Sequence, residues 1–344
     1  VQLPEINIVD LREAYRRKQM RSHFSEQLLN EMRVALSHGE RVILFQNRRG
    51  FSIYLECADC GRIPQCKNCN VSMTYHKRDN KLICHYCGYT SKIPVTCPDC
   101  GSPKIQMQGF GTEKIEDEIA VFFPDARIER MDMDTTRSKT SYEQILSEFE
   151  SGRINILVGT QMISKGLDFD NVSLVGILNA DNMLNYPDFR AYERSFQLML
   201  QVSGRAGRKN KRGKVIIQTF DSKNELYKLV KQHDYATFAR IQLTERKHFN
   251  YPPYARIIEI MLKHRKNNVV KESAGYFVQR LREQVDGQVL GPENPMVDKI
   301  KNYYLQRILV KIEKEKSVAK VKETIKNVVK NLILFFADSQ ARTE

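Results

Sequence analysis

Tryptophan is absent from this chain of 344 residues, and cysteine occurs only between Cys57 and Cys100. The chain shows no secretory signal and no apolar run long enough to cross a membrane. The missing signal argues against a secreted domain held by disulfides, so we expect a cytoplasmic protein in a reducing compartment with no membrane partner. Without tryptophan, stacking on a nucleic-acid base would depend on tyrosine, phenylalanine, histidine or arginine.

The eight cysteines form four Cys-x-x-Cys pairs. One such turn points two sulfurs at one ion, and two turns close a tetrahedral Cys₄ zinc site. The residue after each second cysteine is glycine or asparagine, the types that best tolerate a left-handed backbone; these are Gly61, Asn70, Gly88 and Gly101. The pattern predicts two zinc ions, with a disulfide framework as the disfavoured alternative.

Spacing between the pairs favours a nested arrangement. The second pair and the third are separated by an interval typical of a zinc ribbon, which predicts one site from Cys66, Cys69, Cys84 and Cys87. The first pair then meets the fourth, which predicts the other site from Cys57, Cys60, Cys97 and Cys100. His76 and His85 are left over and are expected not to be ligands. Closed Cys₄ sites leave no position for substrate, so the predicted role of zinc is structural.

The charge balance points to a polyanionic partner. Lysine and arginine number 55 against 41 acidic residues, a formal charge of +14. Nucleic acid is the first candidate, although a basic protein with a solvated surface would have the same composition. The chain begins at Val1 and not at methionine, and we expect it to be a piece of a longer polypeptide.

Strand and helix patterns alternate over much of the chain and predict a parallel, doubly wound α/β sheet. The cysteine segment interrupts this pattern after the apolar run Arg41-Val-Ile-Leu-Phe-Gln46. After residue 220 the pattern changes to that of a smaller α+β domain. The predicted domains are a lobe of residues 1–50 and 102–220, an inserted zinc module of residues 51–101, and a C-terminal α+β domain of residues 221–344.

The segment Gln201-Val-Ser-Gly-Arg-Ala-Gly-Arg208 closes a predicted long helix. Arg205 and Arg208 are about one helical turn apart, so both can reach one anion. Guanidinium groups at such a place neutralise charge on a transferring phosphoryl group. Gln201 could contact the nucleotide or order the attacking water. The plainer alternative is a basic helix end that complements the helix dipole.

Several basic or glycine-rich loops follow predicted strands. Ligands gather at the carboxyl ends of strands in an open α/β sheet, so these loops predict a shared phosphate-binding rim. We expect Gly166, Asp168 and Gly204 to contact a nucleotide. Arg48, Arg49, Thr112, Thr160 and Lys165 lie on these loops and are expected to contact phosphate, either of the nucleotide or of a nucleic-acid backbone. Thr112 is also expected to cap the helix that follows it, and Asp132 and Asp134 are interpreted as turn residues and not as catalytic carboxylates.

Taken in order, these motifs closely resemble the PriA family of bacterial primosomal helicases, superfamily 2 enzymes that restart stalled replication forks. The resemblance runs from near Val9 to about Pro253, and more loosely to the C-terminus. The residues that carry it, besides the four cysteine pairs, are Phe45 to Gly50, Gly111 to Glu113, Gly159 to Met162, Lys165 and Gly166, Asp188 to Ala191, and Gln201 to Arg208.

The resemblance implies a second RecA-like helicase lobe with an inserted two-zinc module and a C-terminal domain similar to ribosomal protein S10. It implies 3′-to-5′ DNA unwinding driven by ATP with Mg²⁺, and Arg205 and Arg208 would complete the ATP site. The implied partners are branched and single-stranded DNA, single-stranded DNA-binding protein, and primosome and helicase-loading proteins at bacterial replication forks.

Two motifs of such helicases are missing from the 344 residues: the Gly-x-x-x-x-Gly-Lys-Ser/Thr phosphate loop and the Asp-Glu-x-His magnesium box. Leu167 stands where relatives more often have histidine. Without a phosphate cradle and a magnesium ligand we expect this chain alone not to hydrolyse ATP. A different class of protein would also fit the composition, namely a non-enzymatic zinc-containing DNA-binding scaffold on a RecA-like fold.

Overall fold

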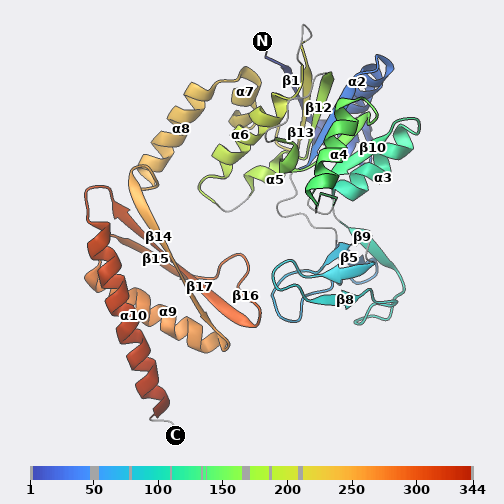
Figure 1. Ribbon diagram of the computed structural model, residues 1–344. Coiled ribbons are helices and arrows are strands. Elements are labelled where there is room, and N and C mark those ends of the chain that lie inside the picture. The colour runs from blue at the N-terminus through green and yellow to red at the C-terminus, as the bar shows by residue number, and fades with distance from the viewer. Residues whose placement is uncertain are drawn as a thin grey trace. The chain divides into compact units, whose positions relative to one another are not determined.

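The computed structural model describes residues 3–46, 54–76, 80–108, 111–132, 135–136, 138–164, 171–185, 188–207 and 212–341, with side chains as far as residue 332. The chain divides into two compact units. The first holds residues 1–52 and 109–240, and the second holds residues 53–108 and 241–344. Figure 1 shows the elements of both.

The first unit is built on a sheet of six parallel strands. Their order across the sheet is β1 (Glu5–Asp10), β13 (Lys214–Thr219), β12 (Val172–Leu178), β4 (Arg41–Gln46), β11 (Ile156–Gly159) and β10 (Ile128–Met131). All residues of β4 and β11 are buried. Such continuous apolar strands are typical of a parallel sheet covered on both faces.

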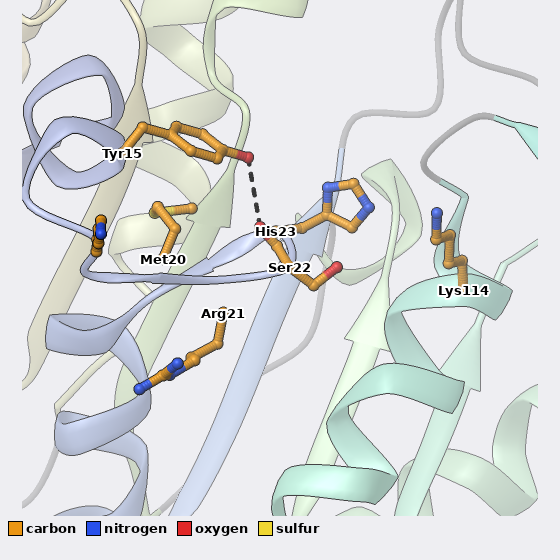
Figure 2. Close-up of a pocket in the computed structure, with 7 residues that line it drawn as sticks. Tyr15, Met20, Arg21, Ser22, His23 and Lys114 are labelled. Atoms are coloured by element: carbon orange, nitrogen blue, oxygen red, sulfur yellow. Dashed lines mark hydrogen bonds between the residues drawn. The ribbon is translucent and has the colours of Figure 1, made fainter.

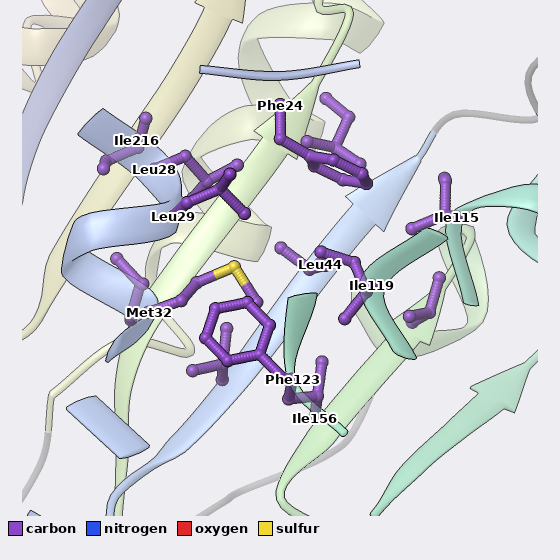
Figure 3. Packing of buried hydrophobic residues seen from close by; sticks show 14 of the residues in the cluster. Phe24, Leu28, Leu29, Met32, Leu44, Ile115, Ile119, Phe123, Ile156 and Ile216 are labelled. Carbon is purple, nitrogen blue, oxygen red and sulfur yellow. The ribbon is translucent and has the colours of Figure 1, made fainter. Parts of the chain in front are cut away.

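Helices α2 (Glu26–Ser37) and α3 (Thr112–Phe122) pack on the sheet over one apolar cluster. Figure 3 shows Leu28, Leu29 and Met32 of α2 directed toward Leu44 of β4, with Ile119 of α3 beside them. Ser25 caps α2 by accepting a hydrogen bond from the N–H of Leu28. Burial of each such leucine contributes about 1.5–3 kcal/mol to stability.

The other helices of the first unit connect and flank the strands. Helix α6 (Ala191–Ser203) packs against β12, and α7 (Glu225–Gln232) packs against β1. The remaining elements are α1 (Leu11–Arg16), the short hairpin β2 (Met20–Arg21) and β3 (Phe24–Ser25), α4 (Lys139–Glu150), the 3₁₀ helix η1 (Gln161–Ser164) and α5 (Asp181–Leu184). Helix α8 (Tyr235–His248) contains the division between the units.

The cysteine segment of the second unit has little regular structure. Strand β5 (Tyr54–Cys57) pairs with β9 (Ile105–Gln108), and β6 (Thr74–His76), β7 (Lys81–Ile83) and β8 (Thr90–Lys92) form a small antiparallel sheet. Its apolar cluster is small and includes Cys66, Cys69 and Cys84 themselves. A segment with so small a core depends on metal for its stability.

The C-terminal part of the second unit is an antiparallel sheet with two helices packed on it. The strands are β14 (Ala255–His264), β17 (Tyr303–Glu313), β15 (Gln288–Glu293) and the short β16 (Lys299–Ile300), which pairs with β17. Helices α9 (Asn267–Gln284) and α10 (Val318–Ala341) share an apolar cluster with the strands. None of the helices, within the described residues, is long and apolar enough to span a membrane.

The predicted fold class is confirmed: a parallel sheet with helices, two cysteine clusters and a C-terminal α/β part. One strand of the parallel sheet was missed, namely β1, which precedes β4 in the chain and lies at the edge of the sheet. The predicted cap at Thr112 is wrong. Gly111 is the N-cap and no side chain caps α3, since the Thr112 hydroxyl donates to Asp132 instead. The predicted domain boundaries stay predictions.

Candidate metal centres and phosphate-binding motifs

The eight cysteines gather into the two predicted sets. Within each set the four sulfurs lie within 4.8 Å of one another. The Sγ atoms of Cys57 and Cys100 are 3.6 Å apart, as are those of Cys60 and Cys97 and those of Cys66 and Cys87. A disulfide would bring them to about 2.0 Å, whereas a zinc–sulfur bond of about 2.3 Å in a tetrahedron separates sulfurs by about 3.8 Å. The residues fit two zinc ions.

We call the set Cys57, Cys60, Cys97 and Cys100 site 1, and the set Cys66, Cys69, Cys84 and Cys87 site 2. Three of the four turns close as the sequence predicts. Gly61, Gly88 and Gly101 have φ of 72°, 77° and 74°, and each N–H donates to the carbonyl of the first cysteine in its pair at 2.8 Å.

The turn at Cys66–Asn70 differs. Asn70 is not among the described residues with positive φ, so the expected left-handed conformation is wrong at this turn. Its N–H donates at 3.0 Å to the carbonyl of Lys299, a residue of the C-terminal sheet. Site 2 therefore takes one turn closure from outside the cysteine segment.

The fold favours ionisation of one sulfur in each site. A hydrogen bond from the backbone N–H of Cys60 lowers the pKa of Cys57 to about 7. Burial opposes ionisation of Cys87, but hydrogen bonds from the Tyr89 N–H and from neighbouring thiols outweigh it and lower its pKa to about 7. Burial raises the pKa of Cys69 to about 12, although a hydrogen bond from the N–H of Lys301 acts in the opposite direction. Zinc binds thiolates, so metal binding would displace the remaining protons.

The two spare histidines of the cysteine segment contact each other. The Nε2 atoms of His76 and His85 are 2.9 Å apart, and their ring centroids are 5.1 Å apart. Neither histidine belongs to a described metal cluster. The four sulfurs of each site already supply a tetrahedral set, and the expectation that both histidines are non-ligands stays a prediction.

The Gln201–Gly207 part of the arginine motif lies at the amino end of β12. Gly207 has φ of 80° and donates its N–H to the carbonyl of Val172, the first residue of that strand, at 2.8 Å. Gln201 and Gly204 are exposed and Arg205 is half-buried. Burial lowers the pKa of Arg205, yet a guanidinium stays charged at neutral pH.

Gly213 holds the motif close to the sheet. A Cβ added there would meet the backbone carbon of Ala206 at 2.3 Å and the nitrogen of Gly207 at 2.4 Å. Only glycine allows this approach of the chain before β13 to the chain after α6. The position of Arg205 is therefore fixed by a backbone contact and by the Gly207–Val172 hydrogen bond.

Thr160 lies at the opposite end of the strands, directly after β11. It is 7% exposed, and its N–H donates to the carbonyl of Met131 at 3.4 Å. A Cβ on Gly159 would meet Cδ1 of Ile163 at 2.4 Å and the carbonyl of Met131 at 2.9 Å, which explains the glycine at this turn.

Thr112 and Asp132 lie at the same edge as Thr160. The Thr112 hydroxyl donates to Oδ2 of Asp132 at 2.6 Å, and the two residues are 2% and 1% exposed. Oδ1 of Asp132 accepts a hydrogen bond from the N–H of Thr135 at 3.1 Å. Asp132 is therefore a turn residue, as the sequence predicts, and the Thr112 side chain is engaged inside the protein.

A basic hollow of about 600 Å³ lies on the same unit. Figure 2 shows His23 and Ser22 of the β2–β3 turn between Tyr15 and Lys114, with the Tyr15 hydroxyl donating to the Ser22 carbonyl at 3.4 Å. Lys18 and Arg21 also line the hollow. Burial and the Lys114 charge lower the pKa of His23 to about 4, so that this ring is neutral at neutral pH. Its lining suits an anion.

Six predicted site residues lie outside the described residues: Arg48, Arg49, Lys165, Gly166, Asp168 and Arg208. The described members divide between the two ends of the strands, with Gln201, Gly204 and Arg205 at one end and Thr112 and Thr160 at the other. Strands β11 and β12 are both parallel to β4, so Thr160 lies at the carboxyl ends of the strands and Val172 at the amino end.

Sequence reasoning missed a second basic hollow, of about 350 Å³, on the C-terminal sheet. Its lining is Arg265, Lys299, Lys301, Asn302 and Tyr304. Lys299 Nζ lies 5.3 Å from the Tyr304 ring centroid. The pair Lys301–Asn302 between aromatic and apolar residues could have indicated a tight hairpin turn, because asparagine tolerates positive φ.

Three family models match the chain. They describe the "PriA DNA helicase Cys-rich region (CRR) domain" at residues 66–92, the "Helicase conserved C-terminal domain" at residues 110–210, and the "Primosomal protein N C-terminal domain" at residues 247–334. Their order follows the order of the parts described above.

Curated relatives match most of the chain. It is 43% identical over 316 residues to "Replication restart protein PriA" of Bacillus subtilis, a match that covers 91% of this chain and 39% of that protein. The protein of the same name from Borreliella burgdorferi is 35% identical over 311 residues, or 89% of this chain and 47% of the relative. The chain thus spans less than half the length of these relatives.

Solved structures show a weaker likeness. A structure of RecG bound to a three-way DNA junction matches with a TM-score of 0.39 and 12% identity, over 70% of this chain and 22% of that one. The Hef helicase domain of Pyrococcus furiosus matches with a TM-score of 0.27 and 18% identity, over 59% and 27% of the two chains. At these scores the likeness carries no argument about function.

Proposed function

Because this chain belongs to the PriA family of replication restart proteins, we propose that it is the C-terminal part of an ATP-dependent 3′-to-5′ DNA helicase. The whole protein would recognise and remodel stalled replication forks and start primosome assembly there. The observation that carries the proposal is that one parallel sheet links Thr160, at the carboxyl ends of its strands, to Arg205, at the amino end of β12. A motor needs such a link between a nucleotide site and a nucleic-acid site.

The nucleotide site would form around the amino end of β12. Arg205, together with Arg208, would face the triphosphate of ATP bound with Mg²⁺ on another part of the protein, with Gln201 beside the phosphates. Gly166, Asp168 and Gly204 would approach the nucleotide through their backbone or a short side chain. An arginine positioned in this way contributes mainly by stabilising transition-state charge. The rigid attachment of Gly207 to Val172 supports such positioning.

The DNA contacts would form around the carboxyl ends of β4 and β11. In the sequence, Thr160 and Lys165 follow β11, and Arg48 and Arg49 follow β4. The Thr112 hydroxyl donates a hydrogen bond to Asp132, so the Thr112 side chain would fix the start of α3. Backbone N–H groups at the start of α3 would bind the DNA phosphate. The basic hollow that includes Lys18 and Lys114 adds positive charge to this unit.

The zinc module would act with other proteins. The two zinc ions would keep residues 54–108 folded, since neither site leaves a ligand position open. We propose single-stranded DNA-binding protein and primosome and helicase-loading proteins as partners, at replication forks in the bacterial cytoplasm and nucleoid. This chain alone would not hydrolyse ATP, because its 344 residues contain neither a phosphate loop nor a magnesium box.

The test is the substitution Arg205→Ala in the complete gene product. We expect DNA-stimulated ATP hydrolysis to fall by about 10³-fold or more, as for loss of an arginine finger, with unwinding lost in parallel. The matched control is Arg153→Ala, which removes an exposed arginine that follows α4 and should leave both rates unchanged.

Three results would contradict the proposal. Full ATP turnover in the Arg205→Ala protein would remove the arginine from the nucleotide site. A complete gene product that binds forked DNA yet never hydrolyses ATP would instead support the zinc-containing DNA-binding scaffold. Hydrolysis by the 344-residue chain alone would show that the ATP site does not require the missing motifs.

A further inference from the structure

The hairpin of β16 and β17 turns through two residues in the left-handed region. Lys299 pairs with Tyr304 and Ile300 with Tyr303, which leaves Lys301 and Asn302 as the turn. Their φ angles are 51° and 64°. A non-glycine residue in this region is less stable than in its right-handed conformation, because Cβ crowds the following carbonyl oxygen. Asparagine tolerates it better than lysine, so the Lys301 conformation needs support from its surroundings.

That support comes from the turn Cys66–Asn70 of site 2. The N–H of Lys301 donates to Sγ of Cys69 at 3.2 Å. The N–H of Asn302 donates to the carbonyl of Asn68 at 2.7 Å, and its Nδ2 donates to Oδ1 of Asn68 at 3.2 Å. The hairpin tip thus bonds both the backbone and a ligand sulfur of the zinc-binding turn.

The residues before the tip complete the contact. The N–H of Asn70 donates to the carbonyl of Lys299 at 3.0 Å, and its Nδ2 donates to Oδ1 of Asp298 at 2.8 Å. Ile300 packs against the apolar cluster that contains three of the four site 2 cysteines. Three consecutive residues of the turn, Asn68 to Asn70, are therefore held by hydrogen bonds to residues 298–302.

Site 1 takes its corresponding hydrogen bonds locally. The donors to Cys57 belong to Asp59 and Cys60, and the donor to Cys100 belongs to Ser102. At site 2, Cys66 and Cys87 also accept hydrogen bonds from residues close in sequence, namely from the N–H groups of Asn68 and Tyr89. Cys69 is the exception, because its donor lies 232 residues away in the C-terminal sheet.

We propose that the hairpin tip, residues 298–302, is the second coordination shell of site 2, so that retention of zinc there depends on the C-terminal sheet. An N–H bond to a metal-bound thiolate spreads its negative charge and fixes its direction, and loss of outer-shell partners commonly weakens metal binding 10–100-fold. The contact also works in reverse, since zinc fixes the turn on which the hairpin rests. Site 2 thus forms a metal-dependent contact between the cysteine segment and the C-terminal sheet. The proposal does not rest on helicase activity.

The experiment measures zinc protection site by site, as the alkylation rate of each cysteine peptide by N-ethylmaleimide in the presence of a chelator. The test variant is Asp298→Ala with Asn302→Gly, which removes both side-chain bonds and keeps the positive φ and all sulfurs. We expect the four cysteines of site 2 to react about 10-fold faster than in the unsubstituted chain. The four cysteines of site 1 should react at an unchanged rate.

Two further variants keep the result interpretable. Asp286→Ala removes an exposed ion pair with Lys316 elsewhere on the same sheet and should change neither site. Lys301→Gly keeps the N–H and relieves the positive φ, so site 2 should be protected as well as before or better. Equal acceleration at both sites, no acceleration at site 2, or acceleration by Lys301→Gly would overturn the proposal.

Discussion

The parallel sheet of the first unit and the cysteine segment of the second are stabilised in different ways. The sheet has a cluster of fully buried apolar side chains from two helices and several strands. The cysteine segment has short strands of three or four residues and an apolar cluster partly made of its own metal ligands. One region can fold on burial of apolar surface, whereas the other depends on metal.

The difference also decides where each region tolerates change. In the closely packed sheet, the loss of one buried side chain disturbs the packing of its neighbours. The cysteine segment depends instead on eight sulfurs and a few hydrogen bonds. Experiments that remove one kind of stabilisation at a time should separate the two regions.

Removal of zinc is expected to have the largest effect. A strong chelator under reducing conditions should unfold residues 54–108, so that the backbone amides of β5, β7 and β9 exchange at unprotected rates. The amides of β4, buried in the parallel sheet, should keep their protection. Hydrogen exchange with peptide-level resolution checks both, and loss of protection in β4 along with β5 would show that the two regions do not differ as argued.

Much of this contrast could be predicted from the sequence. The spacing of the cysteine pairs predicted which pairs share a metal, because ligand geometry restricts the turn and the interval between turns. The spacing of Leu28, Leu29, Met32 and Leu36 indicates one apolar face of a helix, and in α2 the first three are buried and Leu36 is partly buried. Strand β4 was predicted from its apolar run.

Other features needed the structure. Strand β1 is an edge strand with several part-exposed residues, so its pattern is weak. The separation of Thr160 from Arg205 follows from the direction of the parallel strands, which local pattern does not encode. The Thr112 hydroxyl has two possible partners, a helix end and Asp132, and only the packed structure selects the second. The same holds for the Cys69–Lys301 bond across 232 residues.

The substitution Leu44→Ala is expected to have the next largest effect. Leu44 is fully buried between α2 and α3, and its loss leaves a cavity that should lower the free energy of unfolding of the sheet by about 2–5 kcal/mol. Zinc content should stay at two per chain by metal analysis. Val121→Ala in α3, at a side chain that is 78% exposed, is the control and should change stability little. If the Leu44→Ala protein lost zinc in proportion to its loss of unfolding free energy, the two regions would be thermodynamically coupled.

The smallest expected effect is a pH dependence confined to the sheet. The pKa of His23 is lowered to about 4 by burial and by Lys114, against an ordinary value of 6.5. The unfolded chain therefore binds more protons between these values, and the contribution of His23 to stability is lost as pH falls from 6.5 toward 4. Glu118, 3.8 Å from the ring, has a pKa raised by burial and acts with the opposite sign.

The substitution His23→Gln isolates the histidine term from that of Glu118. Because the ring is partly exposed, solvent screening should reduce the difference between the two proteins to about 1 kcal/mol. Denaturant unfolding of the sheet at pH 7 and at pH 4.5 measures it, with the unsubstituted chain losing more stability on acidification than the glutamine variant. Equal losses would mean that His23 titrates normally and that the hollow around it is open to water. The difference between the two proteins would arise in the first unit, which contains His23.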